Sequence, residues 1–130
     1  MLWQLTFYKK PDAPRVDGFG VGCFSSLDEV RAVQADYAAL PGFRDNPQGT
    51  WELTGHAVDL PADGIVWQVV GYNWSADGDE RDLLYSPIFA DRADAETCLS
   101  ELDAHCKREH LEIMRIEVNR RWFAEGFDSE

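Results

Sequence analysis

Apolar and polar residues alternate along two short segments of the chain whose sequences are alike. Residues 2–8 and residues 66–72 share the pattern aliphatic-Trp-Gln-aliphatic-x-x-Tyr. A period of two residues is typical of a β-strand, and in the first segment it puts the large apolar side chains on one face and Gln4 and Thr6 on the other. The likeness of the two segments predicts an internal duplication.

Each of these strands is followed by the same series of elements. A second apolar strand that ends in Phe, at residues 19–24 and 83–89, leads into a helix in both places. A third strand follows each helix, at residues 51–58 and 111–118. The pattern therefore predicts the order β-β-α-β twice, in pseudo-repeat halves 1–60 and 65–127.

The two helices are predicted from their caps and apolar stripes. Ser26 with Glu29 three residues later forms a capping box, and Asp91 is the matching cap of the second helix. Apolar residues at helical spacing form one stripe in each helix. The stripes are Leu27, Val30, Val33, Tyr37 and Leu40 in the first helix and Ala95, Cys98, Leu99, Leu102 and Cys106 in the second.

These elements predict an α+β fold. The linker at residues 59–64 contains Pro61 and Gly64 and is too short to separate independent domains. We therefore expect a single domain over residues 1–130. Its duplicated β-β-α-β units form a mainly antiparallel sheet, or two abutting sheets, with the two helices packed on one face.

The charge of the chain excludes one class of partner. Of the 130 residues, 24 are acidic and 12 are basic, so the formal net charge is −12. Phosphate backbones repel such a protein, and we expect no binding to nucleic acid. No apolar stretch is long enough to span a bilayer, and Lys9 and Lys10 follow the first apolar run, the reverse of a secretory signal. We therefore expect a cytoplasmic protein without membrane association.

No grouping of residues has a catalytic or cofactor signature. The segment Gly18-Phe19-Gly20-Val21-Gly22 lacks the third glycine of a dinucleotide fingerprint and the Lys-Ser/Thr of a P-loop, which favours a glycine-containing strand or hairpin. His105, Cys106, Glu109 and His110 lie at the end of the second helix, but no second group of Cys or His completes a metal site. We expect a protein that is not an enzyme and holds no cofactor or metal.

An acidic segment occupies the predicted connection between the first two strands of the second half. Residues 75–82 contain four carboxylates but lack the spacing of a calcium loop. One interpretation is a solvated hairpin tip, and the other is a negatively charged projection for a basic protein groove, with aromatic residues as anchors. The candidate partner-binding residues are Trp74, Asp77, Asp79, Glu80, Asp82 and Phe123.

Two further segments carry a resemblance to a known family. Leu40-Pro41-Gly42-Phe43-Arg44-Asp45-Asn46-Pro47-Gln48-Gly49 follows the first helix, and Trp122-Phe123-Ala124-Glu125-Gly126-Phe127 ends the second half. They resemble a small bacterial domain family of uncharacterised function, whose units contain Leu-Pro-Gly-Phe-Arg-Asp-x-Pro-x-Gly and end in Trp-x-x-Gly-Phe, one residue shorter than here. The resemblance implies a small stand-alone domain without catalytic residues, and some similar acidic proteins are immunity proteins for toxins.

These observations favour one class of function over another. The leading hypothesis is a cytoplasmic protein-binding module, specifically an immunity or inhibitor protein that neutralises a basic toxin such as a nuclease, because an acidic protein associates rapidly with a cationic groove. The alternative is a small-molecule-binding α+β domain, enzymatic or regulatory, with its cavity between the sheet and the helices. A homo-oligomer joined through sheet edges is a third interpretation, and the oligomeric state stays open.

Overall fold

The computed structural model describes residues 1–9, 18–78 and 80–127. Each element in these residues lies close to its predicted bounds, and the order β-β-α-β occurs twice. The elements are β1 (Leu2–Tyr8), β2 (Gly18–Phe24), α1 (Leu27–Tyr37), β3 (Thr50–His56), β4 (Ile65–Trp74), β5 (Glu80–Phe89), α2 (Arg92–His105) and β6 (His110–Glu117).

The strands form two three-stranded antiparallel sheets, one from each half of the chain. The strand order is β2-β1-β3 in the first sheet and β5-β4-β6 in the second. Trp3 pairs with Phe24 in the first sheet, and Trp67 pairs with Phe89 in the second, so the register of the halves also repeats. The α+β class is confirmed, and the repeated order and pairing are consistent with a duplication.

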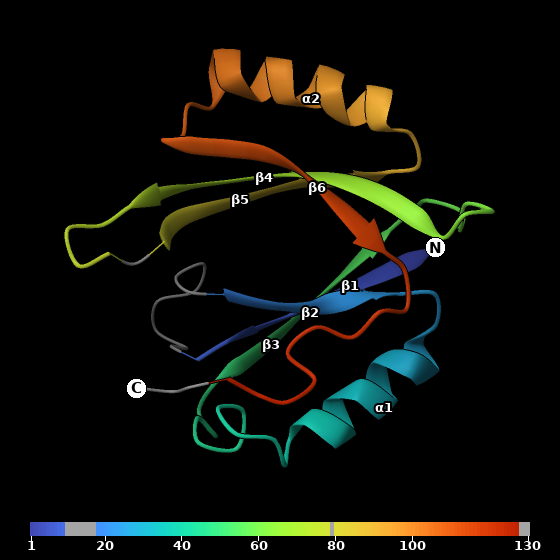
Figure 1. Cartoon of the computed structure of the whole chain (residues 1–130), viewed down its shortest axis with the longest axis vertical. Coiled ribbons are helices and arrows are strands. Elements are labelled where there is room, and N and C mark those ends of the chain that lie inside the picture. The colour runs from blue at the N-terminus through green and yellow to red at the C-terminus, as the bar shows by residue number, and fades with distance from the viewer. Residues whose placement is uncertain (10–17, 79, 128–130) are drawn as a thin grey trace.

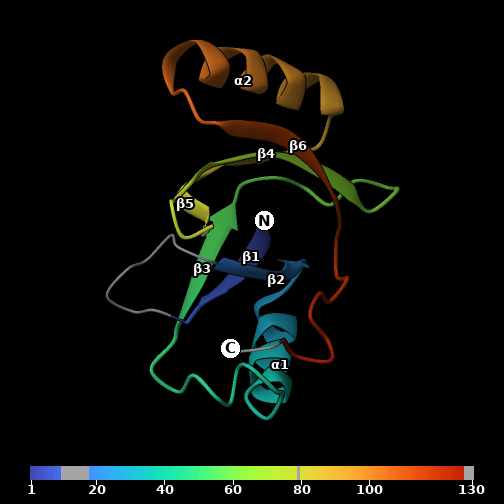
Figure 2. The same ribbon diagram turned by 60° about the vertical axis from the view of Figure 1, so that its left-hand side comes forward.

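The helices lie on opposite sides of the molecule and do not form the single layer that we expected. In Figures 1 and 2, α2 covers the outer face of the second sheet, α1 covers the outer face of the first, and the two sheets lie between them. The inner faces of the sheets are closed by a small cluster of Leu2, Cys23, Val66, Ile88 and Ile116. Because each sheet covers the inner face of the other, each helix is left to cover an outer face.

The two helices differ in how much of their apolar stripe is buried. In α1 the buried residues are Val30, Val33 and Tyr37, and they pack on the core cluster of the first half. In α2 the buried residue is Ala95. The predicted stripe of the first helix therefore forms a core, whereas most of the second stripe stays near the surface.

The predicted caps also differ in their contacts. The Ser26 hydroxyl accepts a hydrogen bond from the Glu29 backbone N–H at 3.1 Å, which is the main bond of the expected capping box. Asp91 stands at the N-cap of α2, but its side chain makes no capping hydrogen bond. The predicted position of the second N-cap is thus confirmed, but the capping hydrogen bond expected from Asp91 is not formed.

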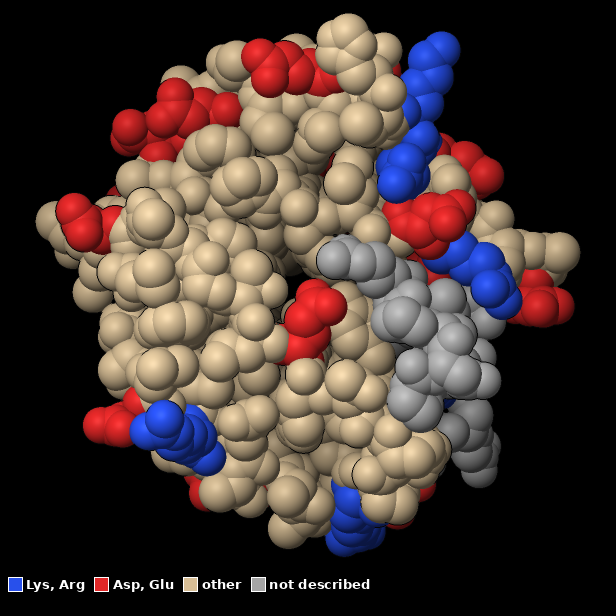
Figure 3. Space-filling model, turned by 180° about the vertical axis from the view of Figure 1, so that it is seen from behind, with Lys and Arg blue, Asp and Glu red and all other residues tan. Residues whose placement is uncertain are grey.

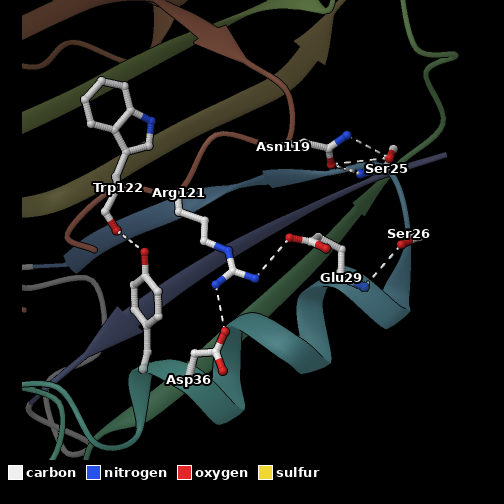
Figure 4. Close-up of polar contacts among 8 residues, drawn as sticks. Ser25, Ser26, Glu29, Asp36, Asn119, Arg121 and Trp122 are labelled. Carbon is white, nitrogen blue, oxygen red and sulfur yellow. Dashed lines mark hydrogen bonds and ion pairs between the residues drawn. The ribbon is translucent and has the colours of Figure 1, made fainter. Parts of the chain in front are cut away.

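The C-terminal segment, residues 118–127, leaves the second sheet and packs on the first half. The backbone N–H groups of Asn119 and Trp122 donate to the carbonyl oxygens of Cys23 and Val21 on the edge strand β2, each at 2.8 Å. Arg121 binds Asp36 at 2.8 Å and also contacts Glu29 of α1, as Figure 4 shows. These contacts attach the end of the second half to the first.

The last residues of this segment reach the loop that follows α1. The Phe127 N–H donates to the Pro41 carbonyl oxygen at 2.9 Å, and the Phe127 ring stacks on Phe19 with ring centroids 3.9 Å apart. Gly42 lies so close to Phe127 that a Cβ at this position would meet its carbonyl oxygen at 2.6 Å. The two segments that carry the family resemblance, one from each half, therefore meet in space.

Equivalent residues of the two halves meet at the centre of the molecule. The Gln4 side-chain amide donates to the Gln68 carbonyl oxygen at 2.7 Å, and the Gln68 amide donates to that of Gln4 at 2.9 Å. Gln4 and Gln68 occupy the same position in the repeated pattern. Because each glutamine donates to the other from the same position of its half, the two halves are related by an approximate two-fold axis that passes through this pair.

Candidate functional site

Among the described residues, two clefts lie between the sheets, on either side of the Gln4–Gln68 pair. The larger, here the β2–β6 cleft, has a volume of about 420 Å³ and lies where β2 faces β4 and β6. The smaller, here the β3–β5 cleft, has a volume of about 90 Å³. Figure 3 shows a hollow near the centre of the molecule seen from behind, with one acidic side chain beside it and the other charged groups mainly at the periphery.

The two clefts are related by the approximate two-fold axis, and one residue explains much of their difference in size. Thr6 of β1 pairs with Gly20, and the equivalent Val70 of β4 pairs with Tyr85. Gly20 therefore stands where the other half has a tyrosine, and a Cβ at Gly20 would meet no heavy atom within 4 Å. The missing side chain leaves the β2–β6 cleft open.

The β2–β6 cleft has an apolar body. Its lining includes Val70, Leu83, Met114 and Ile116 from the second sheet, and Gly18 and Gly22 flank Gly20 on β2. The cavity lies between the two sheets, not between the sheet and the helices, where the alternative hypothesis places it. A volume of this size falls in the usual range for small-molecule sites.

Negative charges and an aromatic group gather at one part of this cleft. Tyr72, Glu80 and Glu112 line it, and the Tyr72 ring stacks on His110 with centroids 4.7 Å apart. Burial, and then the charges of Glu80 and Glu112, raise the pKa of the Tyr72 phenol. Glu112 lies 3.3 Å from the His110 Nε2.

The predicted partner-binding residues do not gather in one place. Glu80 and Phe123 line the β2–β6 cleft, and Trp74 packs against Tyr72 with ring centroids 5.0 Å apart. Asp77 is exposed at the tip of the β4–β5 hairpin. Asp82 turns back, and its carboxylate accepts a hydrogen bond from the Asn73 side chain at 3.0 Å. Asp79 lies outside the described residues.

The aromatic residues of the C-terminal segment complete one part of the cleft lining. Phe123 contacts Phe19 edge-on with centroids 5.3 Å apart, yet remains 41% exposed. Trp122 also lines the cleft, and its backbone oxygen accepts from the Tyr37 hydroxyl at 2.8 Å (Figure 4). The segment thus holds two exposed aromatic side chains next to the β2–β6 cleft.

Sequence reasoning does not identify Tyr72, Glu112 or Gly20 as site residues. Tyr72 belongs to the repeated strand pattern and Glu112 to an ordinary amphipathic strand, so neither stands out among other residues. The alternating glycines at 18, 20 and 22 are a usable signal, because a strand with glycine at every second position leaves one of its faces without side chains. The segment is a strand, β2, as predicted.

The histidines do not gather into a catalytic group. His56 is buried between the sheets, His105 is at the end of α2, and His110 stacks on Tyr72. No cluster of three or more His, Cys, Asp or Glu suited to a metal ion occurs in the described ranges. No helix in the part of the chain that the structure describes has the length and apolar character that a membrane span needs.

The chain was compared with protein-family models, curated proteins and solved structures. No protein-family model, curated protein or solved structure matches the chain. The candidate site is therefore defined by its geometry alone. It consists of the β2–β6 cleft, the aromatic and acidic residues around Tyr72, and the adjoining β4–β5 hairpin.

Proposed function

We propose that this protein is a cytoplasmic binding module for a basic protein partner, of the immunity or inhibitor type that neutralises a toxin such as a nuclease. The observation that carries this proposal is the β4–β5 hairpin, which projects from the side of the molecule (Figure 1). The hairpin presents the exposed carboxylate of Asp77 and the Trp74 side chain, which is 50% exposed. A large exposed aromatic beside acidic groups suits an interface with a cationic protein.

The base of this hairpin is held by the loop between α2 and β6. Arg108 Nε donates to the Asp82 carbonyl oxygen at 2.8 Å, and the Glu109 N–H donates to the Asn73 side chain at 2.9 Å. The Glu109 carboxylate accepts from the Trp74 N–H at 3.3 Å. Residues that are held in place before binding lose less conformational entropy on association, so these bonds to residues 73, 74 and 82 support a recognition role.

The charge distribution supports the same proposal. The second half, which contains the hairpin, carries 15 acidic and 7 basic residues, whereas the first half, residues 1–64, carries 9 and 5. Long-range attraction raises the association rate of oppositely charged proteins and weakens as salt is added. A basic partner would therefore be attracted mainly toward the half that presents the hairpin.

The test is charge reversal in the hairpin. The partner is isolated by affinity capture from the native organism, and its association rate with the wild type and with Asp77→Lys/Glu80→Lys is measured against ionic strength. We expect association several-fold slower at low salt and a flatter salt dependence in the variant, because exposed charges act through a screened field with a Debye length of ~8 Å at physiological salt. Equimolar wild type should also inhibit the partner's activity.

A second double variant controls for total charge. Asp28→Lys/Asp59→Lys makes the same change in net charge at two exposed positions of the first half. This control should leave most of the rate enhancement intact. An acidic partner, a rate that does not depend on salt, or equal effects of the two double variants would each contradict recognition by the hairpin.

A further inference from the structure

The β2–β6 cleft carries an inference that goes beyond binding of a protein partner. We propose that it is a binding site for a small organic cation with an apolar, aromatic-sized body, of the arylalkylamine kind. The apolar part of the ligand fills the space beside Gly20, and the cationic group lies against Glu80, Glu112 and the ring of Tyr72.

The cleft has room and an apolar surface for the body of such a ligand. Its volume is about 420 Å³, and the wall at β2 has no side chain at Gly20. Val70 and Met114 line the opposite side from β4 and β6. Removing an aromatic ring from water against these side chains contributes favourably to binding, in proportion to the apolar area that becomes buried.

The charges at the cleft favour a cation over an anion. Tyr72, Glu80 and Glu112 all line the cleft, so it presents two carboxylates together with one aromatic ring. Arg115 also lines the cleft, but its guanidinium donates to Glu117 at 3.1 Å, so an acidic neighbour balances it. An ammonium group next to a tyrosine ring and carboxylates is stabilised by cation–π and ionic contacts.

Divergence of the two halves distinguishes this cleft from an accidental gap. In the strand register Tyr85 of the second half is equivalent to Gly20 of the first, and the Tyr85 side chain lines both clefts. The equivalent space across the approximate two-fold axis, the β3–β5 cleft, is lined by Thr54 and His56 where the larger cleft has Met114 and Ile116. Glu52 and Glu112 occupy equivalent positions, so both clefts keep a carboxylate. The two clefts thus share a carboxylate and differ in volume and in the apolar lining that a ligand needs.

The test uses the full chain labelled with ¹⁵N and titrated at pH 8, so that histidine charge does not enter. The compounds are 2-phenylethylamine and tryptamine, with 2-phenylethanol as the neutral and 3-phenylpropanoate as the anionic counterpart. We expect saturable amide shifts confined to β2, β4 and β6 for the amines, with millimolar dissociation constants, which suit ligands of this size. The alcohol should bind at least threefold more weakly than the amine, and the anion should give no saturable shift.

Two substitutions test separately the volume of the cleft and its negative charge. Gly20→Leu fills the cleft at a position with open space and should weaken amine binding at least tenfold, while Glu112→Gln should weaken it about threefold. The matched controls Ala104→Leu and Glu101→Gln, on the exposed face of α2, should leave binding unchanged. If Gly20→Leu does not fold, Met114→Trp fills the same cleft from β6.

Three outcomes would contradict the proposal of a cation site in the β2–β6 cleft. They are that neither amine gives saturable shifts, that the anion binds as well as the amine, or that the shifts persist in both cleft-filling variants. Because the hairpin experiment measures association with a captured protein, a negative result there leaves this titration unaffected.

Discussion

At the scale of single residues, the inner faces of the sheets contain a polar network. His56 Nδ1 accepts a hydrogen bond from the Ile88 N–H at 3.3 Å, so the proton of the neutral ring is on Nε2, which donates to the Gln4 carbonyl oxygen at 3.1 Å. Protonation of Nδ1 would place two donors against each other. The network therefore requires neutral His56, and burial lowers the pKa of its imidazole below the ordinary 6.5.

This arrangement predicts a stability that falls in mild acid. Because the folded pKa of His56 is below the unfolded one, the unfolded chain binds more protons as the pH drops below about 6.5, and the stabilisation present above that pH is lost. Urea unfolding at pH 7.5 and 5.5 should show that wild type loses more stability between these pH values than His56→Gln, which keeps an amide donor and acceptor. The exposed control His105→Gln should behave as wild type, and equal pH dependence in all three proteins would refute the role of His56.

At the scale of elements, the strands and α1 follow directly from sequence pattern. Alternation at Trp3 and Trp67 predicts the two central strands, and the buried stripe of α1 has the period of a helix packed on a sheet. The same pattern cannot show what covers the polar face of β1. Gln4 and Thr6 have the character of a solvent-facing side, yet Thr6 is only 6% exposed and Gln4 bonds to the fully buried Gln68. Pairing of polar groups across the molecule is not visible in local periodicity.

The C-terminal segment is the element whose packing the sequence left least determined, and two glycines test it. Gly126 has φ +87° and a Cβ there would meet the Pro41 carbonyl oxygen at 2.3 Å, whereas Gly78 has φ +84° and open space around it. Both Gly→Ala substitutions impose similar backbone strain, of about 1 kcal/mol. Gly126→Ala should destabilise by roughly 2 kcal/mol more in urea unfolding because it also displaces the segment. Equal losses for the two variants would mean that the segment is not held as tightly as its contacts indicate.

At the scale of the whole molecule, the candidate site belongs to neither half alone. The β2–β6 cleft combines Gly20 of the first half with Tyr72 and Glu112 of the second, and Phe123 returns from the chain end to line it. Sequence reasoning predicts the two halves and part of the hairpin surface. It does not predict the cleft, because that depends on how the two sheets face each other, which no local pattern of one half contains.

The Gln4–Gln68 pair, as the main polar contact between equivalent positions, predicts how strongly the two halves are coupled. Replacing one glutamine by Leu removes the partner of one polar atom of the other amide, the Gln4 nitrogen or the Gln68 oxygen, while the contacts of Gln4 with His56 and of Gln68 with Ser86 stay possible. An unsatisfied polar group inside the protein costs about 1–3 kcal/mol. The double variant Gln4→Leu/Gln68→Leu removes both members of the pair, so its loss should be smaller than the sum of the single losses by roughly 1 kcal/mol or more. The free energies of unfolding of wild type, both single variants and the double variant, measured in urea at pH 7.5, give this coupling energy directly. Gln48→Leu, at an exposed position of the loop after α1, combined with Gln68→Leu is the additive control. If the losses of the two single glutamine variants add within ~0.5 kcal/mol, the two amides do not act as a pair. The contact between equivalent residues would then not couple the stability of the two halves.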